Sequence, residues 1–370
     1  MFMRSGWDIY DPEAMPRQKR PLQVDPPDEF HFPSGDGTPL RLTRYRGGSK
    51  GPVILSHCIG VSSLMYATDT IKTNLLEYLY AREFDVWLLD YRFSIELPAS
   101  RNQATMDDVA TRDYPAAVSK VRQLAAADSV QVVAHGVGSS TFSMALLAGL
   151  SGVRAAVCSQ VSTHLVVPTV NRIKTRLRAS SAIAAMGISH LNAYTDAHSD
   201  WKNRLYDRFL TLYPIPKGER CDNPVCRRIT SIYGPLWKHD KLGAQTHHAL
   251  YEMFGVVNVQ ALEQLALITR RSHLVNARGK DVYLPHLKRM DLPIAFIHGS
   301  ENDCVLPRST ETTYDLVTKE NAKSQYSRHV IPQYGHVEVL TMSASWPKES
   351  LRTPAPITGP DFVGPSCSVE

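Results

Sequence analysis

The chain has 370 residues, of which 43% are hydrophobic and 21% charged, a composition typical of soluble globular proteins and unlike that of disordered or fibrous chains. Its 41 basic residues outnumber its 36 acidic ones only slightly and are scattered along the chain, which argues against nucleic-acid binding. No stretch reaches the roughly 18 uninterrupted apolar residues of a membrane helix, and residues 1–20 lack the apolar core of a secretion signal. We therefore expect a soluble cytoplasmic protein that does not insert into membranes.

The six cysteines are too few for a disulfide scaffold and too dispersed for paired zinc ligands. Only two of them lie close together, and these form either a local disulfide or a pair of reduced packing residues. We expect no metal and no cofactor. The six are Cys58, Cys158, Cys221, Cys226, Cys304 and Cys367.

Short apolar runs alternate with helical patterns in two parts of the chain. Residues 1–37 are rich in proline and charge and read as a surface arm. The predicted strands are Leu40–Tyr45, Pro52–Ser56, Val86–Leu89, Ser129–Ala134, Val153–Ser159, Pro293–His298 and Ser327–Ile331. The predicted helices are Thr70–Arg82, Met106–Ala126, Ser139–Leu150 and Ser309–Lys319. Parallel strands need long crossovers, so this order indicates an α/β fold with a mostly parallel sheet and flanking helices.

The alternation of strands and helices stops between residues 164 and 284, which read as helices separated by loops. We expect a core made of residues 38–163 and 285–344, with residues 164–284 inserted as a helical cap. The proline-rich tail, residues 345–370, is predicted to be disordered and to leave Cys367 exposed.

The residues from Val132 to Ser139 combine an apolar strand, a turn of small residues and the start of a helix. This is the context of a nucleophile elbow, in which a strained turn presents a central side chain above the sheet. The central residue here is Gly136. Glycine tolerates the positive φ of such a turn but offers no nucleophilic atom.

Two partners of a nucleophile follow in the expected order. His336, preceded by Gly335, lies after the last predicted strand, where a general base would reach over the sheet edge. The loop after Gly299 offers Asn302 or Asp303 to orient that histidine, with Glu301 a weaker choice. An aspartate suits a serine nucleophile, whereas an asparagine suits a thiolate–imidazolium pair.

The loop after Ser56 is the place for an oxyanion hole, and we expect the backbone amides of Ile59 and Val137 to form it. His57 and Cys58 on the same loop are candidate substrate contacts. Cys58 could also be a displaced nucleophile, although it lies on this loop rather than at the elbow.

Together these residues resemble the α/β-hydrolase superfamily. More narrowly, the chain is similar to the α/β-hydrolase domains fused to or encoded beside cholesterol-oxidase-like (GMC-type) flavin oxidoreductases, over roughly residues 38–342. The matching segments are Leu42–Gly48, Asp90–Arg92, Ala134–Ser139, Cys158–Gln160, Gly218–Cys221, Cys226–Arg228, Ile232–Gly234, Met253–Gly255 and Gly335–His336.

The resemblance implies a helical cap over an apolar pocket and action on esters or thioesters of lipid-like, steroid or polyketide-like acids. It also implies a cysteine or serine at the elbow, from which Gly136 departs, and an amide at the acid position, which Asn302 matches better than Asp303. Cap histidines in matching stretches are candidate pocket residues. These are His164, His239, His247 and His248.

Three interpretations of Gly136 follow. The protein is a hydrolase or acyltransferase whose nucleophile has been replaced, which we favour because the rest of the triad is present. Alternatively, it is a non-covalent lyase or cyclase that uses His336 as a general base, or a binding protein that has lost the chemistry. In each case the partner is a small hydrophobic molecule, and the apolar cap helices offer a surface for a homodimer.

Overall fold

The computed structural model describes residues 15, 17–176, 184–185, 187–195, 201–212, 215 and 219–338. Eight strands form one sheet in the order β1-β2-β4-β3-β5-β6-β9-β10. Their bounds are β1 Asp28–Pro33, β2 Pro39–Arg46, β3 Pro52–Ser56, β4 Asp85–Asp90, β5 Val130–His135, β6 Val153–Ser159, β9 Ile294–Gly299 and β10 Tyr326–Ile331. The strands from β4 to β10 in this order run parallel, whereas β2 is antiparallel to both of its neighbours, β1 and β4. The predicted α/β architecture is confirmed.

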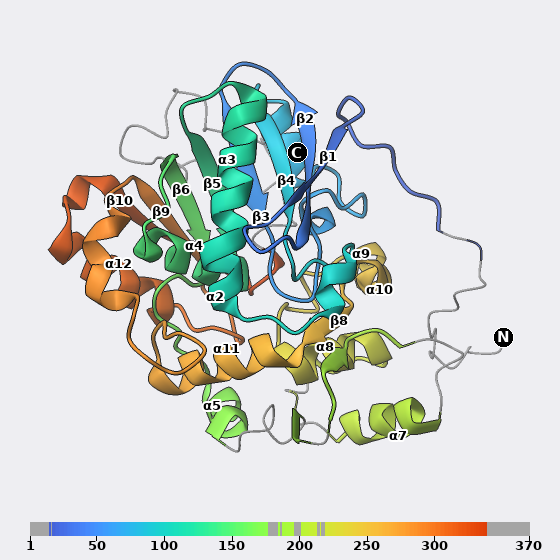
Figure 1. Cartoon of the computed structure of the whole chain (residues 1–370). Helices are drawn as coiled ribbons and strands as arrows, with labels where there is room; N and C mark the ends of the chain where they lie inside the picture. The colour runs from blue at the N-terminus through green and yellow to red at the C-terminus, as the bar shows by residue number, and fades with distance from the viewer. Residues whose placement is uncertain are drawn as a thin grey trace.

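The central strands are apolar on both faces because helices cover both sides of the sheet. Every residue of β3, β4 and β5 is buried. Figure 1 shows α3 and α4 in front of the sheet and α12 beside β9 and β10. The helices of this part are α1 Leu75–Tyr80, α2 Met106–Asp108, α3 Tyr114–Ala125, α4 Val137–Ala148 and α12 Arg308–Glu320, with short 3-10 turns η1 Ser63–Tyr66, η2 Pro98–Arg101 and η6 Lys323–Gln325.

The predicted N-terminal arm is partly wrong, because its last residues form the edge strand β1. Phe30 and Phe32 are two residues apart and lie on the same face of this strand. Phe32 is buried, and the Phe30 ring lies 5.8 Å from that of Trp87. Prolines and charges around the two phenylalanines concealed this alternation. Residues 1–14 and 16, and the tail 345–370 with Cys367, lie outside the described residues.

The helix predicted over Met106–Ala126 is present but contains a π-turn, η3, at Val109–Asp113. Pro115 follows within the first turn of α3 and lacks the N–H that a regular helix would use there. A wider turn accommodates this missing donor.

A buried charge cluster joins this π-turn to the loop between β1 and β2. Asp113 is fully buried and accepts hydrogen bonds from Arg92 Nη2 at 2.6 Å, Arg92 Nε at 2.8 Å and Ser34 Oγ at 2.6 Å. Arg92 also pairs with Asp36 at 3.1 Å. Burial raises the pKa of Asp113, and Arg92 opposes this by lowering it. The cluster therefore depends on the guanidinium of Arg92.

The chain between β6 and β9, which we call the β6–β9 segment, is mainly helical. It also holds a small antiparallel sheet of β7 and β8, so the prediction of helices and loops alone was wrong for these residues. In Figure 1 the segment gathers at one end of the main sheet. Its elements are α5 Thr169–Arg176, β7 His190–Asn192, α7 Trp201–Leu210, α8 Pro224–Tyr233, α9 Ala244–His248, α10 Leu250–Met253, β8 Val256–Asn258, α11 Val259–Arg271 and η5 Leu284–Met290.

Two hydrogen bonds place the β6–β9 segment against the loops at the carboxyl ends of the strands. Tyr233 donates its hydroxyl to Ile59 O at 3.0 Å, and the His336 N–H donates to Leu236 O at 3.0 Å.

Among the described helices, none is long and apolar enough to cross a membrane.

Candidate active site

The turn between β5 and α4 has the geometry of a nucleophile elbow. Gly136 lies in it with φ +56° and ψ −126°, donates its N–H to Ser159 O at 3.1 Å and precedes the first residue of α4. Residues that carry a side chain rarely adopt this backbone conformation, so a glycine here avoids strain. At Gly138 an added Cβ would overlap His57 O, so only glycine allows α4 to approach the β3 loop this closely.

His336 lies over this elbow, in the loop after β10. Its Nε2 is 3.2 Å from the point that a Cβ on Gly136 would occupy. The side chain is only 4% exposed. Its backbone is held from both sides, since the N–H donates to Leu236 O and the carbonyl accepts from Gln160 Nε2 at 2.9 Å. The histidine therefore faces the place where an elbow side chain would begin.

Asn302, rather than Asp303, contacts the histidine. The Nδ2 atom of Asn302 lies 2.9 Å from His336 Nδ1. Asp303 instead forms an ion pair with Lys238 at 2.7 Å, and the side chain of Glu301 is exposed. Of the three candidates, the structure brings only Asn302 to the ring of His336.

The Asn302 amide has one orientation that satisfies its neighbours. Its Oδ1 accepts the backbone N–H groups of Cys304 and Val305, each at 2.9 Å, and its Nδ2 donates to Gln160 Oε1 at 2.9 Å. A flipped amide would lose all three bonds and set donor against donor. Nδ2 therefore donates to His336 Nδ1, and the neutral ring carries its proton on Nε2, which points toward Gly136.

Comparison with known proteins supports the architecture. No family model and no curated protein matches the chain. Among solved structures, an esterase from Thermogutta terrifontis is 12% identical, with a TM-score of 0.51 over 85% of this chain and 93% of its own. A hydrolase from Pseudomonas aeruginosa is also 12% identical, with a TM-score of 0.51 over 85% and 94%. The fold is that of the α/β-hydrolases.

A monoacylglycerol lipase from Paleococcus ferrophilus is a further neighbour of this α/β-hydrolase fold, at 11% identity and a TM-score of 0.50 over 80% of this chain and 90% of its own. Identities this low establish the fold alone. The narrower resemblance to domains associated with flavin oxidoreductases stays a prediction.

Cys58 occupies the space beside Gly136 at the elbow. Its Sγ lies 2.9 Å from the position of a Cβ on Gly136 and accepts the N–H of Val137 at 3.4 Å. Burial raises the pKa of the thiol, while bonds from the Val137 and Ile59 amides lower it. The two amides predicted to form an oxyanion hole thus both interact with Cys58.

Gln160 is a site residue that the sequence analysis did not single out. It follows β6 with φ +73°, and its Oε1 accepts from Gly299 N at 3.1 Å and from Asn302. Its Nε2 donates to the carbonyls of Gly335 and His336. Gln160 therefore connects the loops that carry Asn302 and His336. The only sequence signal was its place in a segment that resembles the family.

Two further histidines lie close to His336. The ring of His135 is 4.8 Å from that of His336, and burial lowers the pKa of His135 to about 3. His298 donates through Nε2 to Val305 O at 2.9 Å, and its pKa is lowered to about 4. Burial, followed by these two neighbours, lowers the pKa of His336 well below its usual value. Burial therefore favours the neutral form of all three rings.

The remaining candidates lie in other surroundings. His57 is fully buried and stacks on Tyr91 with ring centroids 4.2 Å apart, beneath the loop rather than on its surface. His164 lies 6.1 Å from His273, ring to ring. His239 contacts both His247 and Cys226, so the structure groups these histidines with cysteines rather than with His336. Their role in substrate binding stays a prediction.

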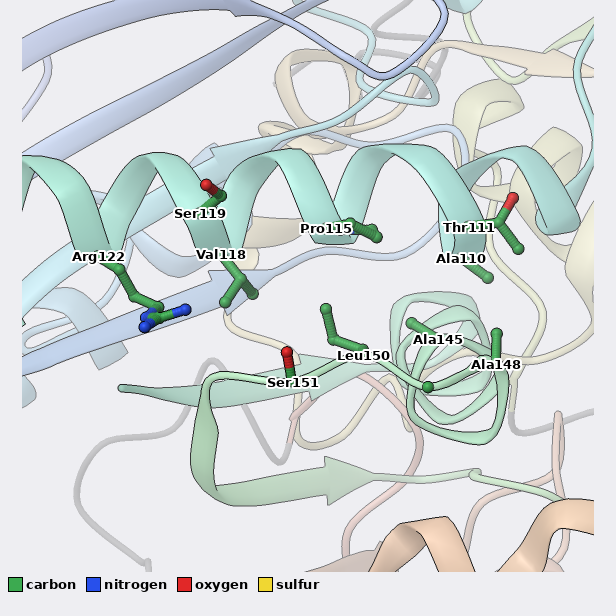
Figure 2. Close-up of a pocket in the computed structure, with 11 residues that line it drawn as sticks. Ala110, Thr111, Pro115, Val118, Ser119, Arg122, Ala145, Ala148, Leu150 and Ser151 are labelled. Atoms are coloured by element: carbon green, nitrogen blue, oxygen red, sulfur yellow. The ribbon is translucent and has the colours of Figure 1, made fainter. Parts of the chain in front are cut away.

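One pocket lies away from this site, between the helices on the front of the sheet. It has a volume of about 290 Å³ and is lined by residues of η3, α3, α4 and the turn that follows α4, among them Ala110, Val118, Arg122, Ala145 and Leu150 (Figure 2). None of its lining residues belongs to the elbow, the Asn302 loop or the His336 loop.

We expect the nitrogen NMR signals of His336 to identify the Nε2–H tautomer at pH 7. Asn302→Asp replaces the donor with an acceptor, so the proton should move to Nδ1 in that variant. Asp303→Asn, which changes the adjacent residue, serves as the control and should leave the tautomer unchanged. A wild-type signal typical of Nδ1–H would contradict the orientation of the Asn302 amide.

Proposed function

We propose that this α/β-hydrolase binds the carbonyl group of a carboxylic ester or thioester, and that Gly136 prevents an acyl-enzyme from forming. One observation supports this most directly. Nε2 of His336 and Sγ of Cys58 lie 3.2 Å and 2.9 Å from the position of a Cβ on Gly136, and the amides of Ile59 and Val137 both bond the Cys58 thiol. Hydrogen-bond donors arranged in this way stabilise a carbonyl oxygen that gains negative charge.

The network around Asn302 also determines which nucleophile would fit. A serine needs a neighbouring nitrogen without a proton, but Asn302 keeps the proton of His336 on Nε2. A thiolate instead accepts a hydrogen bond from that same Nε2–H, and the first turn of α4 favours its negative charge. Cysteine at position 136 is therefore compatible with Asn302, whereas serine requires an aspartate at position 302.

With a cysteine at position 136, the sulfur would attack the substrate carbonyl and the amides of Ile59 and Val137 would bind the resulting oxyanion. Cys58 Sγ, which lies 2.9 Å from the position of a Cβ on Gly136, would first have to rotate out of that space. Collapse of the intermediate would break the bond to the leaving group, which departs as its anion and takes a proton from solvent. Water or an acceptor alcohol would then attack the acyl-enzyme, lose its proton to solvent and release the acid or ester with the thiolate restored. The identity of the acceptor, water or an alcohol, distinguishes hydrolase from acyltransferase activity.

We expect Gly136→Cys to form an acyl adduct, visible by intact-protein mass spectrometry, with p-nitrophenyl esters and acyl thioesters. Gly136→Ser should form one only together with Asn302→Asp. Gly136→Ala is the matched control and should form none. All variants are also made with Cys58→Ser, so that acylation of Cys58 is recognised.

A panel of acyl chains of increasing length and of ring-containing acids tests the lipid-like, steroid or polyketide-like substrate class that the family resemblance implies. If no position-136 variant forms an adduct, the covalent ancestry of the site is excluded. If the unaltered chain turns esters over without an adduct, Gly136 does not block chemistry and the proposal fails.

A ligand-binding role without chemistry is the second candidate. The same Nε2–H favours it over a lyase or cyclase, because a protonated Nε2 donates and cannot abstract a proton. Tight binding of a hydrophobic ester with no conversion, and no activity in any variant, would support this role.

A further inference from the structure

Two cysteines and two histidines of the β6–β9 segment converge on one point. Cys221 precedes α8, Cys226 lies in its first turn, His239 follows the helix and His247 belongs to α9. One ligand atom from each lies within 4.8 Å of every other. We propose that these four side chains bind a zinc ion with structural function.

The distances suit tetrahedral coordination. Zinc binds thiolate sulfur at about 2.3 Å and imidazole nitrogen at about 2.0–2.1 Å, which separates neighbouring sulfur and nitrogen ligands by about 3.6 Å. Cys226 Sγ lies 3.4 Å from His239 Nε2, close to this separation. Both cysteines are free thiols rather than a disulfide. The predicted alternative of a local disulfide is therefore not present, and the thiols are available as ligands.

Each histidine has a ring nitrogen that is free to bind a metal. Glu219 Oε2 lies 2.8 Å from His239 Nδ1 and holds the proton there, which leaves Nε2 without a proton and facing Cys226. A carboxylate behind a histidine ligand in this way is the usual arrangement around protein-bound metals. His247 Nε2 is buried and has no hydrogen-bond partner among the described residues. A buried polar atom without a partner is rare in proteins, and a bound metal would satisfy it.

The ligand set favours zinc over harder cations. Thiolate and imidazole ligands suit zinc, whereas magnesium and calcium prefer oxygen ligands. Two thiolates balance the charge of a divalent ion in this partly buried cluster. Four protein ligands leave no open position for water, which is typical of structural rather than catalytic zinc.

The cluster also supports the candidate active site. Lys238, next to His239, donates its backbone N–H to Glu338 and pairs with Asp303 at 2.7 Å. Leu236, two residues earlier, accepts the backbone N–H of His336. A metal at His239 would therefore fix the stretch against which the His336 loop is held.

The test measures metal in the purified full-length chain. We expect one zinc per chain after dialysis, and Co²⁺ substitution should give the visible spectrum of a tetrahedral thiolate site. His247→Ala should lose the metal, while His248→Ala, which changes the exposed neighbour on the same helix, should keep it. Glu219→Gln should weaken binding by about 10–100-fold in competition with a chelator.

Three results would overturn the proposal. One is a chain without zinc that also fails to bind added Zn²⁺ or Co²⁺. Another is a Cys221–Cys226 disulfide in protein purified without reductant, detected by peptide mass spectrometry. The third is equal metal content in His247→Ala and His248→Ala. Because the first two measurements use the unaltered chain, they decide the matter even if His247→Ala does not fold.

Discussion

Replacing Arg92 with leucine should lower the free energy of unfolding by about 3–5 kcal/mol at pH 7. The substitution removes the charge that pairs with Asp113, which is fully buried. Breaking a buried ion pair from one side costs this much because the remaining charge is left without compensation. Denaturant unfolding at pH 7 measures the loss.

The pH dependence gives an independent check. Burial already raises the pKa of Asp113, and without Arg92 the pKa rises further. The folded variant then keeps a proton that the unfolded chain releases near pH 4, so stability falls as the pH rises from about 4 toward the folded pKa. The loss in the free energy of unfolding caused by Arg92→Leu should therefore be smaller at pH 4.5 than at pH 7.

Arg112→Leu is the control for this prediction. Arg112 also bonds Asp36, at 2.7 Å, but its side chain is 47% exposed. Exposed ion pairs contribute about 0–1 kcal/mol, so this variant should be nearly as stable as the unaltered chain. Equal losses in the two variants would show that Asp113 does not depend on Arg92.

Gly299→Ala should disrupt the candidate active site by displacing the loop that carries His336. Gly299 ends β9, and a Cβ there would overlap the carbonyl oxygens of Tyr334 and Gly335. Because these atoms are backbone, the loop that carries His336 must move as a whole. We expect a loss of about 1–3 kcal/mol or more in the free energy of unfolding.

The displaced loop should also separate His336 from Asn302, and the NMR signal of the Nε2–H tautomer should broaden or shift. Gly35→Ala is the matched control, because a Cβ there makes only ordinary contacts with Arg112 at 3.7 Å. If Gly299→Ala leaves both stability and the His336 signal unchanged, the close approach of β9 to this loop is not a constraint on the site.

Most of the parallel sheet was predictable because its strands are continuous apolar runs bounded by small or polar residues. The edge strand β1 was not, since an edge strand buries one side and tolerates prolines and charges. The β7–β8 pair was also missed. Each of its strands has only three residues, too few for an alternating pattern to stand out.

The site was predicted in position but not in chemistry. Chain order pointed to Gly136 and His336, yet spacing alone left Asn302 and Asp303 equivalent. Only the fold shows that the Asn302 amide donates to the imidazole, which is the reverse of the role an aspartate would play. We expected the asparagine to suit an imidazolium, and the orientation of its amide instead favours a neutral ring.

The cysteine and histidine cluster is not apparent from the cysteines alone, because their wide dispersion argues against paired zinc ligands. Four residues separate Cys221 from Cys226, and twelve separate Cys226 from His239, both close to known zinc spacings. The interval of seven from His239 to His247 is longer than usual, because His247 comes from a separate helix.

The positive φ at Gly136 makes this position a point where activity and stability oppose each other. Any side chain that restores a nucleophile must adopt a backbone conformation that costs about 1–3 kcal/mol in residues other than glycine. Under the proposed function, a single change away from glycine would add a nucleophile at the expense of stability, and a change to glycine would give that stability back. In a lineage with this fold, drift toward a more stable protein would therefore silence the enzyme while the rest of the site persists.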